Sequence, residues 1–355
     1  MNVHETFSTA FGGNPDTDVF VPGRVNLIGE HIDYNGGRVL PYALPQGVSV
    51  ALRLRDDGFV SVASERFEGA SKAALGSPPA DGWAKYAHYT VQLARDIGWP
   101  VQGADIAITS NLSDGAGLSS SAALCVAVLK ALRSVSGQTA SDSEIAQLAR
   151  RVENDYIGMP CGIMDQMAVA VASSGEALFL DTASLDFESI PLPHDVAFCV
   201  LHSGVHRELA DGRYKMRKEE CDQAKVYFGT DDLCHLPLTS LADATDLDPA
   251  IGRRVRHCIT EHVRVVAAAE ALKAGRMNAF GDAMNASHIS MRDDFEMSVP
   301  AIDALVETAT TRGALGARLT GGGFGGCIVA AVERSEVERW TKDVLSEHPS
   351  AFLVQ

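Results

Sequence analysis

Residues 115–121 read GAGLSSS and stand directly before a helical pattern. Glycines let backbone amides approach an anion closely, and the unpaired N–H groups at the start of a helix attract it. Hydroxyl groups beside them can bind phosphate oxygens or Mg²⁺. A helix start with a serine cap is the plainer interpretation, but a cap needs only one serine. The Walker A pattern GxxxxGK[ST] is absent, so a different phosphate cradle and a capped helix both remain open.

A second polar stretch, residues 21–44, carries Arg24, Glu30, His31 and Asp33 among glycines and β-like residues. Carboxylates and an imidazole so close in sequence form a set of hydrogen-bond acceptors and donors of the kind that binds vicinal hydroxyl groups. The plainer alternative is a polar loop between two strands, and the stretch alone does not exclude it.

Asp165 stands in a third stretch, residues 154–172, where a proline and two glycines deliver it to the expected start of a helix. A carboxylate at this place is available for chemistry. It is also favourable in the first turn of any helix, because it complements the helix dipole.

A fourth stretch, residues 318–332, has glycine at 321–323, 325 and 326. Five glycines within six positions exceed what a plain hairpin needs, and they predict backbone that passes close to a ligand or another loop. A GxGxxG spacing is present, but the turn leads into a β-like run rather than a helix, which makes the dinucleotide interpretation weak.

The elements that must position these residues mix strands and helices without regular βαβ alternation, which predicts an α+β fold. A chain of 355 residues usually holds two domains, and we expect the boundary near residue 175, giving domains 1–175 and 176–355. Helices are expected at 83–97, 118–134, 143–156, 206–227 and over most of 248–310. Strands are expected within 19–62, at 104–110, within 177–193, at 196–204 and on both sides of the glycines of 316–332.

The formal net charge is −16, which argues against a nucleic-acid surface or an anionic membrane as partner. The first residues have no basic and apolar segments of a signal peptide, and no apolar run reaches the length of a membrane span. The seven cysteines are odd in number and scattered, as in a cytosolic protein with reduced thiols. The pairs Cys234-His235 and His257-Cys258 match no zinc-ligand spacing, and no obligate protein partner is evident.

Taken together and in this order, the four stretches resemble the galactokinase family of the GHMP small-molecule kinase superfamily. GRVNLIGEHIDYNGGRVLP is similar to the family's signature and GAGLSSSAAL to the superfamily's phosphate loop. MPCGIMDQ resembles the segment with the catalytic aspartate, and LTGGGFGGCIVA the third motif. The resemblance extends over roughly residues 11 to 332, so it covers both expected domains.

The resemblance implies a two-domain GHMP kinase fold, with the phosphate loop in the N-terminal domain and the active site in the cleft between domains. It implies Mg²⁺-dependent transfer of the ATP γ-phosphoryl group to the C1 hydroxyl of D-galactose. Asp165 and Arg24 match catalytic positions. Sugar-binding positions are matched by Glu30, His31, Ile32, Asp33, Gly162 and Tyr214. Nucleotide-binding positions are matched by Gly115, Ala116, Gly117, Leu118, Ser119, Ser120, Ser121 and Trp83, and metal ligands by Ser121 and Glu153.

Among the departures from the family's pattern, Ile32 is the one that bears on sugar preference. Ile32 stands where the family signature usually has threonine, and Ser113-Asp114 replaces the usual residues before the glycines. A kinase for another C1 hydroxyl, such as that of N-acetylgalactosamine, arabinose or galacturonate, is therefore a second hypothesis. A non-catalytic sugar or nucleotide sensor is a third, although both Asp165 and Arg24 are present. Trp83, expected near adenine, is equally consistent with an ordinary half-buried tryptophan.

Overall fold

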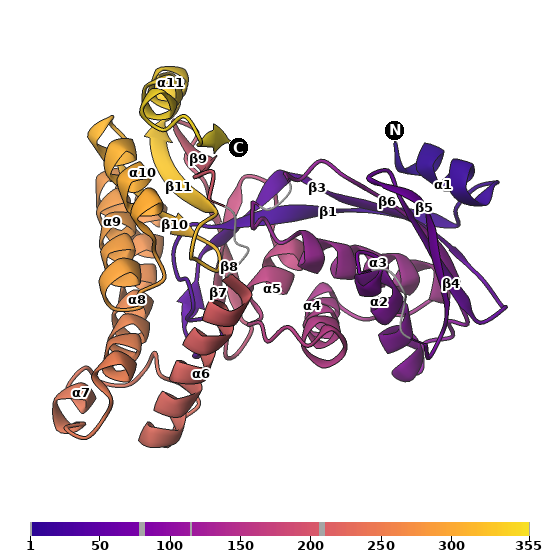
Figure 1. Ribbon diagram of the computed structural model, residues 1–355, viewed down its shortest axis with the longest axis horizontal. Helices are drawn as coiled ribbons and strands as arrows, with labels where there is room; N and C mark the ends of the chain where they lie inside the picture. Colours follow the sequence, from indigo (N-terminus) through magenta and orange to yellow (C-terminus); the bar gives the residue numbers. More distant parts are fainter. Residues whose placement is uncertain (1, 78–81, 114–115, 206–209, 355) are drawn as a thin grey trace. The chain divides into compact units, whose positions relative to one another are not determined.

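The computed structural model describes residues 2–77, 82–113, 116–205 and 210–354 (Figure 1). The chain forms two compact units. Unit 1 comprises residues 1–24, 43–112 and 119–172, and unit 2 comprises residues 25–42, 113–118 and 173–355. The last crossing between units, after Ala172, lies close to the boundary expected near residue 175. Two short segments that precede it in the chain nevertheless belong to unit 2, so the simple division into 1–175 and 176–355 stays a prediction.

Unit 1 is built on β-strands that pair mostly in antiparallel fashion. The strands are β1 (Thr17–Asn26), β3 (Pro41–Leu54), β4 (Phe59–Ser64), β5 (Phe67–Ala74) and β6 (Ala104–Ser110), and β1 and β3 continue into unit 2. Residues 48–54 of β3 pair antiparallel with β6, β6 pairs parallel with β4, and β4 forms an antiparallel pair with β5.

Side chains on the two faces of this sheet alternate, as the pleat of a strand requires. Ala51 of β3 and Ala107 of β6 form a small core with Val3 and Phe7 of helix α1 (Val3–Phe11). Their neighbours along the strands, such as Leu52, point to the other face and are fully buried as well. Both faces of the sheet are therefore covered.

The helices of unit 1 pack on one another. They are α2 (Lys85–Asp96), α3 (Ser120–Ser136), α4 (Asp142–Arg151), the π-helix η1 (Val152–Ile157) and α5 (Met164–Val171). Helix α3 contacts α2, α4 and α5. The sequence SDSE at residues 141–144 predicts a capping box, and the box is present, because Ser141 and Glu144 bond each other's backbone N–H groups at the start of α4. A second capping box, Asn2 with Glu5, starts α1, which the sequence analysis missed.

Unit 2 contains two groups of strands. The first is β2 (Arg38–Val39), β7 (Glu176–Asp181) and β8 (Phe187–Pro191), where β7 pairs antiparallel with both others. The second is an antiparallel sheet in the order β10 (Gly316–Thr320), β11 (Cys327–Glu333), β9 (Val196–His202) and β12 (Phe352–Leu353).

The helices of unit 2 pack on the second sheet, on the first group of strands or on one another. They are α6 (Ala210–Phe228), α7 (Ser240–Asp243), α8 (Pro249–Lys273), α9 (Met277–Asp293), α10 (Pro300–Thr311), the 3₁₀ turn η2 (Arg334–Glu336) and α11 (Val337–Glu347). Figure 1 shows α8 and α9 side by side, and α9 and α10 contact β10. The fully buried Trp340 of α11 donates its indole N–H to the Ala309 carbonyl of α10 at 2.9 Å.

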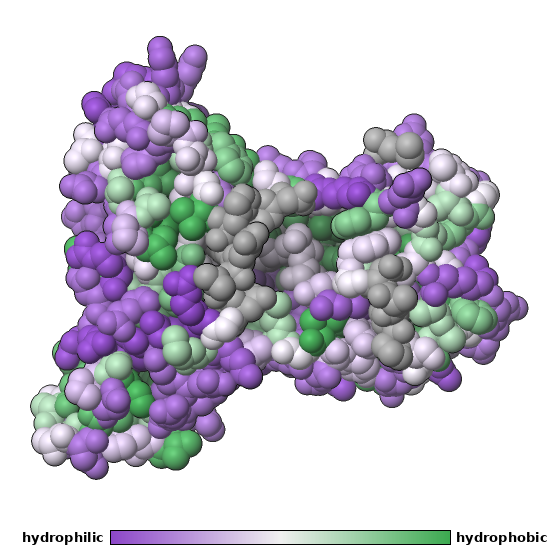
Figure 2. Space-filling view, in the orientation of Figure 1, coloured by the Kyte–Doolittle hydropathy of each residue, from purple (hydrophilic) through white to green (hydrophobic). Residues whose placement is uncertain are grey.

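The observed elements confirm the α+β class and the expected helices and strands, with ends shifted by a few residues, except that the helix expected at 143–156 ends as α4 at Arg151 and continues as the π-helical η1. The part of the helix expected at 206–227 that precedes Ala210 lies outside the described residues. Hydrophilic side chains cover much of the visible surface of both units, in line with the acidic composition (Figure 2). In the described part of the chain, no helix combines the length and the apolar character needed to cross a membrane.

The glycine-rich turn between β10 and β11 packs tightly against neighbouring loops. Gly323 and Gly325 have φ angles of 81° and 127°. A Cβ on Gly323 would lie 2.8 Å from the carbonyl oxygen of Met297, and one on Gly325 would lie 3.0 Å from that of Val205. The expected close backbone approach is therefore confirmed, and it is made to other loops of the same unit.

We predict that Gly323→Ala destabilises the protein much more than Gly137→Ala. Both glycines have left-handed backbones, which alone costs an alanine roughly 1–2 kcal/mol. A Cβ on Gly137 meets nothing within 4 Å, whereas one on Gly323 meets Met297. We therefore expect a loss of about 3 kcal/mol or more for Gly323→Ala in chemical unfolding. Equal losses for both variants would contradict the tight packing of this turn.

Candidate functional site

The Asp165 carboxylate lies in the first turn of α5 and is held by two side chains from distant parts of unit 1. Arg24 donates from Nε to Oδ1 at 2.7 Å, and its Nη2 lies 2.5 Å from the same oxygen. Ser119 donates from Oγ to Oδ2 at 2.6 Å. Ile163, at the N-cap of α5, provides no side-chain cap. A favourable charge in a first turn accounts for neither partner, so the geometry favours a role in chemistry.

Asn154 helps to hold the segment that precedes Asp165. Asn154 accepts a hydrogen bond from the backbone N–H of Cys161 at 2.8 Å, and its amide lies 3.4 Å from the Cys161 carbonyl. Gly162, expected at the sugar site, is buried in this segment. Asn154 belongs to η1, a π-helical turn of a kind that is frequent at functional sites. The sequence predicts a regular helix here, because hydrophobic periodicity does not distinguish a single wide turn.

Glu153, from the same π-helical turn, meets Ser121 of α3. The Ser121 hydroxyl donates to Glu153 Oε1 at 2.8 Å, and Gln166 donates to Oε2. Only 3% of Glu153 is exposed, and burial raises the pKa of its carboxyl group, although the bonds from Gln166 and Ser121 oppose that shift. The two expected metal ligands are thus brought together, as a pair of oxygen donors in a place where a cation would favour the ionised carboxylate.

The three consecutive serines have three different environments. Ser119 occupies the N-cap position of α3 with φ 60° and ψ 40°, a left-handed conformation that costs a non-glycine residue about 1 kcal/mol. Its side chain makes no cap hydrogen bond and reaches Asp165 instead. Ser120 is exposed, and Ser121 bonds Glu153. Neither the Ser119 hydroxyl nor the Ser121 hydroxyl caps the helix.

The expected phosphate loop is divided between the units. Gly115 lies outside the described residues, together with Asp114. Ala116, Gly117 and Leu118 belong to unit 2, where Ala116 and Leu118 are buried and the Ala116 carbonyl accepts from the Cys327 thiol at 3.1 Å. Gly117 has a φ of 71°, which glycine adopts without strain.

Trp83 lies just before α2 and stacks on Phe67 of β5. The ring centroids are 4.7 Å apart and the planes differ by 11°. Phe67 remains 47% exposed, so the pair presents an aromatic surface at the edge of unit 1. The expected contact of Trp83 with adenine stays a prediction.

In unit 2, the Glu30 carboxylate ties the signature segment to the glycine-rich turn. Its Oε1 accepts from the backbone N–H of Gly321 at 2.6 Å and from the Thr320 hydroxyl at 3.1 Å. Asn26 donates to Oε2, and the fully buried Arg318 places Nη2 at 3.7 Å from Oε1. A buried charge requires such partners. Sequence reasoning missed Arg318 and Thr320, although both directly precede the glycines it singled out.

His31 lies beside Glu30 in a cluster of aromatic rings. Its Nδ1 is 2.6 Å from the Tyr34 hydroxyl, and its ring centroid lies 4.9 Å from that of Tyr214 and 4.7 Å from that of Phe295. Burial, assisted by the neighbouring His257, lowers the pKa of His31 to about 3. His31 is therefore neutral near pH 7 and offers one donor and one acceptor nitrogen.

The other expected sugar-binding residues differ in accessibility. Tyr214 of α6 is half-buried, and a Cβ on Gly322 would lie 3.4 Å from its ring. Asp33 is also half-buried. Ile32 is fully buried, and its Cδ1 lies 2.7 Å from where a Cβ on Gly37 would stand. Ile32 thus offers packing rather than a hydrogen bond, and its influence on sugar choice stays a prediction.

Polar side chains of helix α8 hold the signature segment, residues 23–41. His257 Nε2 lies 3.1 Å from the Glu30 carbonyl, and Glu261 accepts from the backbone N–H of Gly29 at 3.1 Å. Ser287 of α9 donates to the same Glu261 oxygen at 2.5 Å. Gly29 has a φ of 108°, and a Cβ there would touch the Val39 backbone at 3.1 Å. The segment around Glu30 is therefore held by buried polar contacts.

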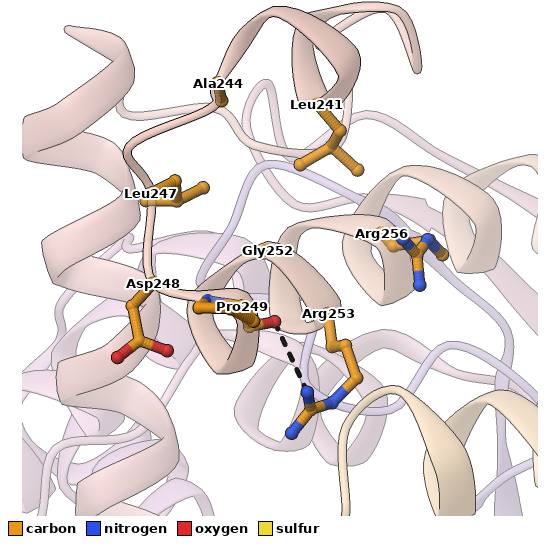
Figure 3. A pocket seen from close by; sticks show the side chains of 8 residues that line it. All are labelled: Leu241, Ala244, Leu247, Asp248, Pro249, Gly252, Arg253 and Arg256. Carbon is orange, nitrogen blue, oxygen red and sulfur yellow. Dashed lines mark hydrogen bonds between the residues drawn. The ribbon is translucent and has the colours of Figure 1, made fainter.

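A cavity of about 370 Å³ elsewhere in unit 2 contains none of the expected site residues (Figure 3). It lies between α7 and the start of α8, and its lining residues are Leu241, Ala244, Leu247, Asp248, Pro249, Gly252, Arg253 and Arg256. Arg253 and Arg256 pair with Glu296 and Asp294, respectively. The cavity therefore presents no cation that is without an acidic partner.

The cysteines do not form a metal centre in the part of the chain that is described. All seven are free thiols there. No group of three or more His, Cys, Asp and Glu side chains in the described ranges has the arrangement of a metal site.

Three family models match the chain. The GHMP kinases N terminal domain matches residues 85–173, and the GHMP kinases C terminal matches residues 268–348. The galactokinase galactose-binding signature matches residues 5–54, which include Arg24, Glu30, His31 and Asp33.

Solved structures agree with these matches. A galactokinase of Lactococcus lactis, crystallised with galactose, is 33% identical with a TM-score of 0.92, over 99% of this chain and 96% of that one. A mevalonate kinase of Methanococcus jannaschii is 19% identical with a TM-score of 0.69, over 96% and 98% of the two chains. A phosphomevalonate kinase of Streptococcus pneumoniae is 15% identical with a TM-score of 0.70, over the same shares. The last two show the fold alone.

Proposed function

The chain belongs to the galactokinase family of the GHMP kinases, and we propose that it transfers the γ-phosphoryl group of ATP to the C1 hydroxyl of D-galactose. The observation that carries the proposal is the Asp165 carboxylate, held by Arg24 and Ser119 in a helix turn that it does not cap. The match to the galactose-binding signature supports galactose as the acceptor.

Asp165 acts on the nucleophile in this proposal. The C1 hydroxyl is a weak nucleophile, and a carboxylate that accepts its proton contributes typically 10²–10⁴-fold in rate. The O1–Pγ bond forms while the bond from Pγ to the bridging oxygen of ADP breaks, and the hydroxyl proton passes to Asp165. Arg24 is permanently cationic, so it orients the carboxylate and offsets negative charge that develops during the transfer.

Ser121 and Glu153 would hold Mg²⁺. A hydroxyl and a carboxylate 2.8 Å apart are hard oxygen donors, which suit this ion, and the burial of Glu153 favours a cation beside it. When bound, Mg²⁺ neutralises charge on the phosphates of ATP. The family resemblance assigns the backbone of 116–118, the hydroxyls of 119–121 and Trp83 to the nucleotide.

Glu30, His31, Asp33 and Tyr214 are assigned to the sugar hydroxyls. The neutral His31 supplies a donor or an acceptor, and carboxylates accept directional bonds from hydroxyl pairs. A site that depends on such bonds rejects an epimer that leaves them unpaired, by up to roughly 10⁴-fold. The free thiols support a reducing compartment, the cytosol, as the place of action.

We predict that the purified protein forms galactose 1-phosphate and ADP from galactose, ATP and Mg²⁺, with glucose a poor substrate. ADP release should be measured against a panel that includes arabinose, galacturonate and N-acetylgalactosamine. The buried Ile32 is why these alternatives belong in the panel. If one of these sugars is turned over faster than galactose, that sugar is the preferred acceptor. If no sugar is turned over, the protein is better described as a non-catalytic sensor.

We also predict that Glu153→Gln raises the Mg²⁺ concentration needed for half-maximal rate and lowers kcat, while galactose binding measured by calorimetry stays nearly unchanged. Glutamine keeps the size of the side chain but loses the charge that attracts the ion. Glu144→Gln, at the exposed cap of α4, is a matched control that should leave the Mg²⁺ titration as in the wild type. An unchanged titration in Glu153→Gln would remove Glu153 from the metal site.

A further inference from the structure

We propose that Ser119 is a positioning residue for the reaction, fixing the plane of the Asp165 carboxylate so that the oxygen not held by Arg24 is oriented to accept the sugar proton. The inference rests on the proposed function and extends it, because the family resemblance assigns Ser119 to the nucleotide. The hydrogen bond from Ser119 Oγ to Asp165 Oδ2 measures 2.6 Å, within the short range typical of a hydroxyl bound to an ionised carboxylate.

The conformation of Ser119 indicates that this bond is its main task. A serine that caps a helix has an extended backbone and bonds the N–H groups of the first turn. Ser119 instead has a left-handed backbone and no cap bond. Glycine would adopt these angles without strain, so the backbone alone does not call for a serine. What a serine adds at this position is the hydroxyl that reaches Asp165.

The two oxygens of Asp165 are made unequal by their partners. Oδ1 receives both Nε and Nη2 of Arg24, which accounts for its two lone pairs. Oδ2 receives Ser119, and among the described residues this bond leaves it one lone pair. Without Ser119, Arg24 would hold only one oxygen, and the plane of the carboxylate could tilt about the bond from Cβ to Cγ. The Ser119 bond opposes that tilt, so the remaining lone pair of the oxygen not held by Arg24 keeps one direction, in which it accepts the proton of the C1 hydroxyl.

The test compares Ser119→Gly with Ser119→Ala. Both remove the hydroxyl, but glycine accepts the left-handed backbone and alanine does not. We expect both variants to lose about 10- to 100-fold in kcat, because small misplacement of a catalytic group has effects of this size. The KM values for galactose and ATP should stay within about threefold, and the Tm of Ser119→Gly should be higher than that of Ser119→Ala, because only glycine adopts the left-handed backbone without strain. As a control, Leu185→Gly also places glycine at a left-handed residue, one that is remote in sequence from Asp165, and it should keep normal kcat.

A double-mutant cycle with Asp165→Asn completes the test. If Ser119 acts through Asp165, Ser119→Gly should change the residual rate of Asp165→Asn by no more than about twofold. An effect that multiplies with that of Asp165→Asn, or a raised KM for ATP with normal kcat, would overturn the inference and assign the hydroxyl to the nucleotide. Normal kcat in Ser119→Gly, with an active wild type, would also overturn it. An inactive wild type would instead contradict the proposed function.

Discussion

The ion pair between Arg24 and Asp165 is the interaction on which the candidate catalytic site depends. The Arg24 side chain is only 6% exposed, and a cation in such a place requires a carboxylate partner. The pair joins the end of β1 to the first turn of α5, which lies 141 residues later in the chain. The hydrogen bond between Asn154 and Cys161 and the left-handed turn at Ser119 then fix the orientation of the Asp165 carboxylate.

In unit 2, too, a buried charge is held by partners of opposite polarity, but here the central group is a carboxylate rather than an arginine. Glu30 is the buried group, and Arg318, Thr320 and the backbone of Gly321 are its partners. The signature segment is thereby tied to the glycine-rich turn. In both units, a residue that the sequence marks as chemically active is also one whose buried charge holds two segments together. Substitutions at these residues therefore affect stability as well as activity, and the two effects must be measured separately.

Much of the fold could be predicted from the sequence, because periodicity, capping boxes and glycines act locally. The helix that becomes α3, the capping box at Ser141 and the close packing of the turn around Gly323 are examples. The π-helical turn that holds Glu153 was not predictable, since a wide turn leaves no periodic signal. Helix α1 was overlooked, although its capping box could have been found by the same rule that found the one at Ser141.

The sequence predicts the candidate site as a set of residues rather than as a set of contacts. The sequence places Ser119, Ser120 and Ser121 in one motif, yet only the structure separates the partner of Asp165 from that of Glu153. Pairs such as these join residues far apart in the chain, and one sequence contains no information on which distant side chains meet.

The central claim is that Asp165 takes the proton of the C1 hydroxyl. Its most direct test is to measure kcat, Tm and galactose binding on one preparation of Asp165→Asn. Asparagine has nearly the same shape but cannot serve as the base, so we predict a folded protein that binds galactose and loses roughly 10²- to 10⁴-fold in kcat. A kcat near that of the wild type would contradict the account and leave Asp165 as a structural partner of Arg24.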